Sequence, residues 1–173
     1  MVTPTRFSLS LPQHQARLFY LAVLYHLARP GSEVDPQTMM PYPHGLSELQ
    51  PLLEAQLNAE SAILELTPFQ LARIGSSLLG VLNELKLYSL LDTMAGASSR
   101  QRSVVSGFDD ALRALFPRVS VDSAYASQLA EDVMMLRREL AASIKRAEEA
   151  LEEERLAAEE ARRGQKRWWQ FWR

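Results

Sequence analysis

The sequence predicts a mainly α-helical fold, in which a compact helical bundle continues into a long C-terminal helix with an aromatic and basic tip. Apolar residues recur at helical spacing through most of the chain. All nine prolines lie at or before Pro117, and residues 118–163 contain neither proline nor glycine. Because proline and glycine are the residues that most often interrupt helices, this stretch is expected to form one long helix.

The composition is that of a folded globular protein with one domain and an appendage. The 173 residues are 47% hydrophobic and 23% charged. The chain has no cysteine, which excludes disulfides, thiolate metal sites and thiol nucleophiles. A net charge of -2 provides no field that would draw the whole molecule to nucleic acid or to an anionic membrane. The longest apolar run, at residues 18–25, is too short to span a bilayer and residues 1–6 carry no secretory signal, so we expect a cytoplasmic protein.

The N-terminal elements are a strand, two helices and the loop between them. Phe7–Leu11 alternates apolar and polar residues, which predicts a short strand. The following helix, over residues 12–29, is apolar on all sides and is expected at the centre of the core. Residues 31–45 are rich in proline and are predicted to form a loop. A second helix is predicted over residues 46–59, with Pro51 in its first turn.

The clearest helix start in the chain lies at Thr67. Thr67 is the expected N-cap, the proline that follows takes the first helical position, and Gln70 completes a capping box, so a helix to about residue 91 is predicted. Gly75 and Gly80 lie inside this helix, where they weaken its intrinsic stability but allow a neighbouring element to approach closely. We interpret both as packing glycines.

Three further segments complete the N-terminal part. Residues 63–66 are predicted to form a second short strand, which could pair with the first into a small two-stranded ribbon. Residues 92–106 have the composition of a mobile loop. A short helix over residues 107–116 is expected to lead into the long one.

The long helix carries an apolar stripe with an eleven-residue repeat, which predicts a nearly straight helix. We expect Asp122 or Ser120 to cap its start and Gly164 to end it. The stripe thins after Leu151, where glutamates cover the surface and are interpreted as a solvated helix face. The stripe consists of Tyr125, Leu129, Val133, Leu136, Leu140, Ile144, Ala147 and Leu151.

The chain is therefore predicted to have three parts. Residues 1–121 form a helical domain with two short strand segments. Residues 122–163 form the long helix, whose first half packs on the domain and whose second half projects. Residues 164–173 form a tail rich in tryptophan and arginine. The density of charged residues rises from about one in six before Asp122 to two in five after it, which supports the first boundary.

Few residues in the sequence suggest catalysis or ligand binding. The three histidines have no carboxylates at the spacing that a helical metal site needs, and His26, late in an apolar helix, is interpreted as a core or boundary histidine. Asp109 and Asp110 are expected to serve the start of a helix. No glycine-rich phosphate loop is present. We expect no metal, no cofactor and no small-molecule ligand.

The C-terminal tail is the candidate interaction site. It holds all three tryptophans of the chain, and clustered aromatic and basic side chains are typical of binding hot spots and of membrane interfaces. The candidate residues are Lys166, Arg167, Trp168, Trp169, Phe171, Trp172 and Arg173.

These features favour a non-enzymatic scaffold, adaptor or assembly subunit whose tail docks on a protein partner. Alternatively, the tail folds onto its own domain or onto a second copy in a homo-oligomer. A peripheral membrane protein anchored by the tail is a further alternative, and an enzyme with an unrecognised site is the opposing class. Nucleic acid is disfavoured, because seven nearby glutamates oppose the approach of phosphates.

Overall fold

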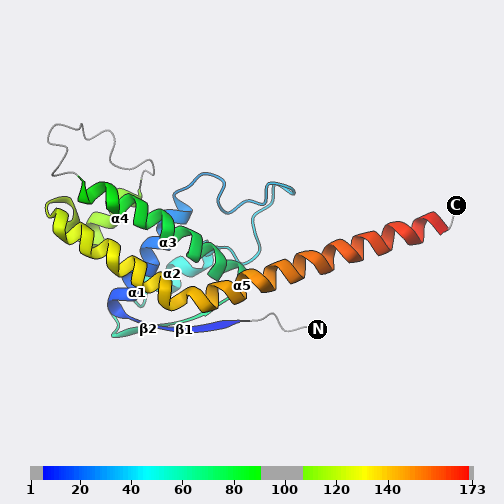
Figure 1. Ribbon diagram of the computed structural model, residues 1–173, viewed down its shortest axis with the longest axis horizontal. Coiled ribbons are helices and arrows are strands. Elements are labelled where there is room, and N and C mark those ends of the chain that lie inside the picture. Colours follow the sequence, from blue (N-terminus) through cyan, green and yellow to red (C-terminus); the bar gives the residue numbers. More distant parts are fainter. Residues whose placement is uncertain (1–5, 91–106, 172–173) are drawn as a thin grey trace.

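The computed structural model describes residues 6–90 and 107–171, with side chains up to Arg163. The fold is mainly helical with one small antiparallel sheet and a long C-terminal helix, as the sequence predicts (Figure 1). The predicted loop over residues 92–106 lies outside the described residues. In chain order the elements are β1 (Phe7–Pro12), α1 (Gln13–Leu27), the 3₁₀ helix η1 (Leu46–Glu48), α2 (Leu49–Glu54), β2 (Ser61–Leu66), α3 (Pro68–Ser89), α4 (Phe108–Leu115), the 3₁₀ helix η3 (Pro117–Ser120) and α5 (Ser123–Phe171).

The two strands pair into the antiparallel ribbon that their alternating sequences suggest. Phe7 lies opposite Leu66, and Leu11 lies opposite Ala62. Alternate residues of β2 are buried, whereas Ile63 between them is 65% exposed. One face of the ribbon therefore packs on the core, and the other faces solvent.

Helix α1 is the centre of the core, as its apolar surface predicts. It contacts both strands and α2, α3 and α4. All residues from Leu18 to Val23 are buried, although they point in every direction around the helix. A helix that is apolar on all sides is stable in water only when other elements cover each side, and the surrounding elements do this.

Helix α3 begins at the capping box that the sequence predicts. The Gln70 backbone N–H donates to Thr67 Oγ1 at 3.2 Å, and the Thr67 N–H donates to Gln70 Oε1 at 2.9 Å. The Gln70 side-chain amide also donates to the Gly45 carbonyl at 3.2 Å, which ties the loop before α2 to the start of α3.

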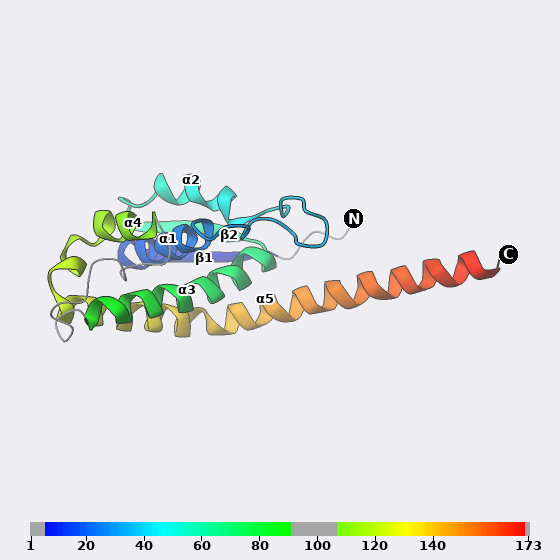
Figure 2. The same cartoon turned by 90° about the horizontal axis from the view of Figure 1, so that it is seen from above.

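Gly75 and Gly80 are packing glycines. A Cβ atom on Gly75 would lie 2.9 Å from Ile144 of α5, and a Cβ on Gly80 would lie 2.1 Å from the Tyr25 ring of α1. Both distances are shorter than van der Waals contact, so each glycine allows a helix approach that alanine would obstruct. α3 and α5 lie side by side as an antiparallel pair (Figure 2).

The apolar stripe of α5 forms its packed face. Residues of the stripe are buried from Leu129 to Ala147, while Tyr125 and Leu151 at its ends are half-buried. Asp122 caps the helix, because its Oδ1 accepts a hydrogen bond from the Tyr125 N–H at 2.9 Å.

Two predicted helix ends were wrong. The segment expected to form one helix over residues 46–59 forms η1 and α2, and α2 ends at Glu54. Beyond this end, the Gln56 side chain donates a hydrogen bond to the Leu52 carbonyl and accepts one from the Ile63 N–H of β2. α5 does not end at Gly164 but continues to Phe171. One glycine costs a helix only about 1 kcal/mol relative to alanine, and the surrounding residues are good helix formers.

Replacement of the N-cap tests the start of α3. The Thr67→Ala variant should be destabilised by about 1 kcal/mol, because the N–H of Gln70 loses its acceptor. Urea denaturation monitored by circular dichroism measures this difference. Ser76→Ala, an exposed serine of the same helix, is the control and should unfold like the wild type. Equal stability of both variants would contradict a role for the cap.

Alanine at position 80 tests the approach of α1 to α3. Gly80→Ala should destabilise the protein by about 1–2 kcal/mol, because the displaced Tyr25 ring loses its edge contact with Phe108 and this outweighs the gain in helix propensity. Chemical denaturation gives the free energy of unfolding. In a Tyr25→Ala background the same substitution should cost nothing, and an unchanged cost there would show that the clash is elsewhere.

Candidate functional site

The long helix α5 extends far beyond the body of the protein (Figure 1). Ala147, at 0% exposure, is the last buried residue among the described side chains, and Leu156 further along is 48% exposed. From Glu148 to Arg163 no side chain is buried. This part of the helix, which we call the stem, contributes no side chain to the buried core.

Ion pairs within the helix cover the stem. Arg155 contacts Glu152 at 2.6 Å and Glu159 at 2.7 Å, one turn away on either side. The hydrogen bonds that Arg155 donates to Glu152 and the charges of both glutamates raise the pKa of Arg155 above its ordinary value, and the same hydrogen bonds lower the pKa of Glu152. Such exposed pairs are individually weak, but several on one helix favour the helical state at positions that nothing else supports.

Five of the seven predicted site residues lie in the last turns of α5, beyond this stem. The backbone of Lys166, Arg167, Trp168, Trp169 and Phe171 is helical, and their side chains are outside the described part. Trp172 and Arg173 lie outside the described residues altogether. The continuous backbone places this sequence at the far end of α5.

Each histidine is paired with a carboxylate. His14 contacts Asp132 at 2.9 Å, and His44 contacts Glu48 at 3.3 Å on the surface. His26 is only 4% exposed, and its Nε2 lies 2.9 Å from Glu33 Oε1, so the interpretation of a hydrogen-bonded core histidine is confirmed. Within residues 6–90 and 107–163, no three histidine or acidic side chains are placed to hold a metal ion.

One buried carboxyl group was missed in the sequence. Glu84 of α3 is 8% exposed and lies near Asp109 of α4. Asp109 forms an ion pair with Arg113, also of α4, at 2.8 Å. Asp109 and Asp110 occupy the first turn of α4, as predicted. Burial raises the pKa of Glu84, and the charge of Asp109 raises it further. The sequence signal that could have predicted this burial is the position of Glu84 next to Leu85, on the apolar side of the helix.

The described part of the chain contains no helix with both the length and the apolar character that crossing a bilayer requires. The chain matches no protein-family model, and comparison with curated proteins and with solved structures gives no significant match.

The environment of Glu84 predicts a pH-dependent effect on stability. Since the folded state raises the pKa of Glu84, it favours the neutral carboxyl, and the wild type loses stability as the pH rises through that pKa. Glu84→Gln imitates the neutral form, so the variant should be more stable than the wild type at pH 8, with a smaller difference at pH 4. Thermal unfolding at both pH values measures this, and exposed Glu65→Gln is the control. A difference independent of pH would contradict the argument.

Proposed function

We propose that this protein is a non-enzymatic interaction or assembly protein, a scaffold or adaptor whose stem presents the aromatic and basic tail to a protein partner or to a second copy. One observation carries this proposal. The backbone of α5 continues for a further 24 residues after Ala147, the last buried residue among the side chains described up to Arg163, and reaches Phe171. At 1.5 Å per residue this extension is about 36 Å long.

The stem is not needed to bury the core. Ordering each backbone residue costs about 1–2 kcal/mol of conformational entropy, and an exposed helix recovers none of this cost from tertiary packing. The stem is instead rich in alanine, glutamate and arginine, with the ion pairs described above. A sequence that maintains an isolated helix is suited to holding its end away from the body.

The residues at that end have the chemistry of a binding hot spot. Tryptophan and arginine are enriched among the residues that dominate binding energies, because they combine a large apolar area with polar or charged groups. Glutamates predominate in the stem, and basic residues predominate from Arg162 onwards. This change of sign favours a partner with an apolar groove and an acidic rim.

The direction of α5 supports an intermolecular contact over a clasp onto the protein's own body. A clasp would require the chain to reverse between Ala147 and Lys166, and the backbone is helical throughout this stretch. A second copy of the chain has no such restriction, so self-association stays part of the proposal.

A membrane surface is the second candidate, favoured by the tryptophans between Lys166 and Arg173. Aromatic side chains next to cations are typical of residues at the headgroup level of a bilayer. The acidic stem is repelled by an anionic surface, so membrane binding would need several tails acting together.

Removal of the aromatic side chains tests the proposal. In the full chain, Trp168, Trp169, Phe171 and Trp172 are replaced by alanine, and sedimentation velocity compares the oligomeric state with that of the wild type. The free energy of unfolding of the body should change by less than about 0.5 kcal/mol, because surface substitutions away from packed sites have small effects. Self-association, or co-purification of a protein that rebinds after isolation, should be lost.

The control carries Leu151→Ala and Leu156→Ala in the stem and keeps the tail. It should bind like the wild type. Co-sedimentation with vesicles containing phosphatidylserine tests the membrane alternative. A tail variant that loses stability would support a clasp on the body, and one that keeps every interaction of the wild type would exclude the tail as the binding site.

A further inference from the structure

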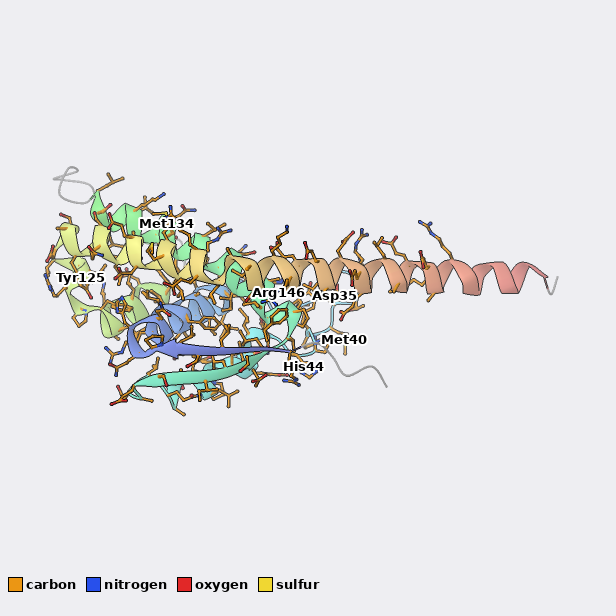
Figure 3. All side chains as sticks on the ribbon, turned by 60° about the horizontal axis from the view of Figure 1, so that its bottom comes forward. Asp35, Met40, His44, Tyr125, Met134 and Arg146 are labelled. Carbon is orange, nitrogen blue, oxygen red and sulfur yellow. The ribbon has the colours of Figure 1, made fainter. Side chains whose placement is uncertain are left out.

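A surface pocket of about 290 Å³ lies between the end of α1, the turn that follows it and α3. His26, Arg29, Tyr42 and Arg73 are among its lining residues. The part of the chain that follows α1 lies at the end of the body from which α5 projects, where Figure 3 labels Asp35, Met40 and His44.

Arg73 is held in this pocket by aromatic rings. Its guanidinium carbon lies 5.0 Å from the ring centroid of Phe69 and 5.4 Å from that of Tyr42. The two rings are themselves in contact, with centroids 4.7 Å apart. Contact with a ring face fixes the guanidinium group without using its N–H donors. Arg73 is half-buried, and among the described residues neither Arg73 nor Arg29 forms an ion pair.

The nearby carboxylate of Glu33 is already occupied. It accepts hydrogen bonds from the Leu46 N–H at 3.2 Å, the Ser47 N–H at 3.2 Å and the Ser47 hydroxyl at 2.9 Å, and it also contacts His26. Burial acts to raise the pKa of Glu33, but the hydrogen bonds from Ser47 and Leu46 bring it below its ordinary value. Glu33 is therefore ionised and hydrogen-bonded to the start of η1, and it forms no ion pair with Arg29 or Arg73.

His26 adds no positive charge to those of Arg29 and Arg73 at neutral pH. Burial lowers the pKa of His26, Glu33 opposes this effect, and the charges of Arg73 and Arg29 lower the pKa further. The pocket therefore combines a neutral imidazole with two cations whose donors have no carboxylate partner in the described part of the chain.

We infer that this pocket binds the oxyanion group of a small molecule, a carboxylate or a phosphate, through Arg73 and Arg29. A planar guanidinium group binds both kinds of oxyanion in bidentate fashion. The volume is at the lower end of the range for ligand pockets, which is suited to a small ligand. The inference concerns the body of the protein and does not depend on the tail.

An NMR titration of the full chain tests this inference. Inorganic phosphate and succinate are added separately at constant pH and ionic strength, with chloride as the reference anion. Backbone amide signals of Gly31, Ser32 and Val34 and the side-chain Nε–H signal of Arg73 should shift and saturate. Saturation by phosphate alone identifies a phosphate ligand, saturation by succinate alone identifies a carboxylate ligand, and saturation by both supports either source of the oxyanion.

Two arginine variants and a matched control sharpen the result. Arg73→Gln should weaken binding at least tenfold, and exposed Arg29→Gln should weaken it at least threefold. The control is Arg118→Gln, because Arg118 also lies over an aromatic ring, Tyr125, at 4.7 Å, and Tyr125 is at the opposite end of the body (Figure 3). Arg118→Gln should bind like the wild type.

Shifts that do not saturate, or that chloride reproduces, would overturn the inference. So would undiminished binding by both Arg73→Gln and Arg29→Gln. If Arg73→Gln fails to fold, Arg29→Gln decides the question, since its side chain is exposed. The variant without tail aromatic residues should bind the anions like the wild type, which separates this result from the proposed function.

Discussion

The antiparallel packing of α3 on α5 is the interaction on which the arrangement of this protein depends. Gly75 lets the two helices approach until Ile144 covers its Cα, and no Cβ would fit there without displacing that side chain. The buried part of α5, from Ala126 to Ala147, is as long as the 22-residue α3. The length of α3 therefore matches the point at which α5 leaves the body and becomes an exposed stem.

A small set of polar contacts, buried at Gln70 and partly exposed at Glu33, fixes the end of the body from which the stem projects. Gln70 completes the capping box of α3 and at the same time binds the carbonyl of Gly45. Glu33 binds the backbone at Leu46 and Ser47, next to that glycine. Because buried polar groups are costly when unpaired, these contacts select one conformation for a proline-rich loop that would otherwise have many. The same conformation places Tyr42 against Phe69 and Arg73.

The two proposals concern parts of the molecule with different physical character. The stem is exposed up to Arg163, and the proposed recognition chemistry depends on which residues the chain carries after it. The pocket depends on the fold, since Arg29 lies in the turn after α1 and Arg73 lies in α3, and both line one pocket only when α1 and α3 pack.

The sequence by itself determined the helical class, the order of the elements, the capping box at Thr67 and the packed stripe of α5. These features depend on local backbone preferences and on periodic burial, which a chain displays without its neighbours. The ends of α2 and α5 were not predicted correctly. α2 ends where the Gln56 side chain accepts a hydrogen bond from β2, and α5 continues through Gly164 because one glycine costs a helix little. The burial of Glu84 and the pairing of Arg73 with two aromatic rings were decided only by tertiary structure. Phe69 is one helical turn from Arg73, but Tyr42 and Asp109 are far in the sequence from Arg73 and Glu84, and only packing brings them close.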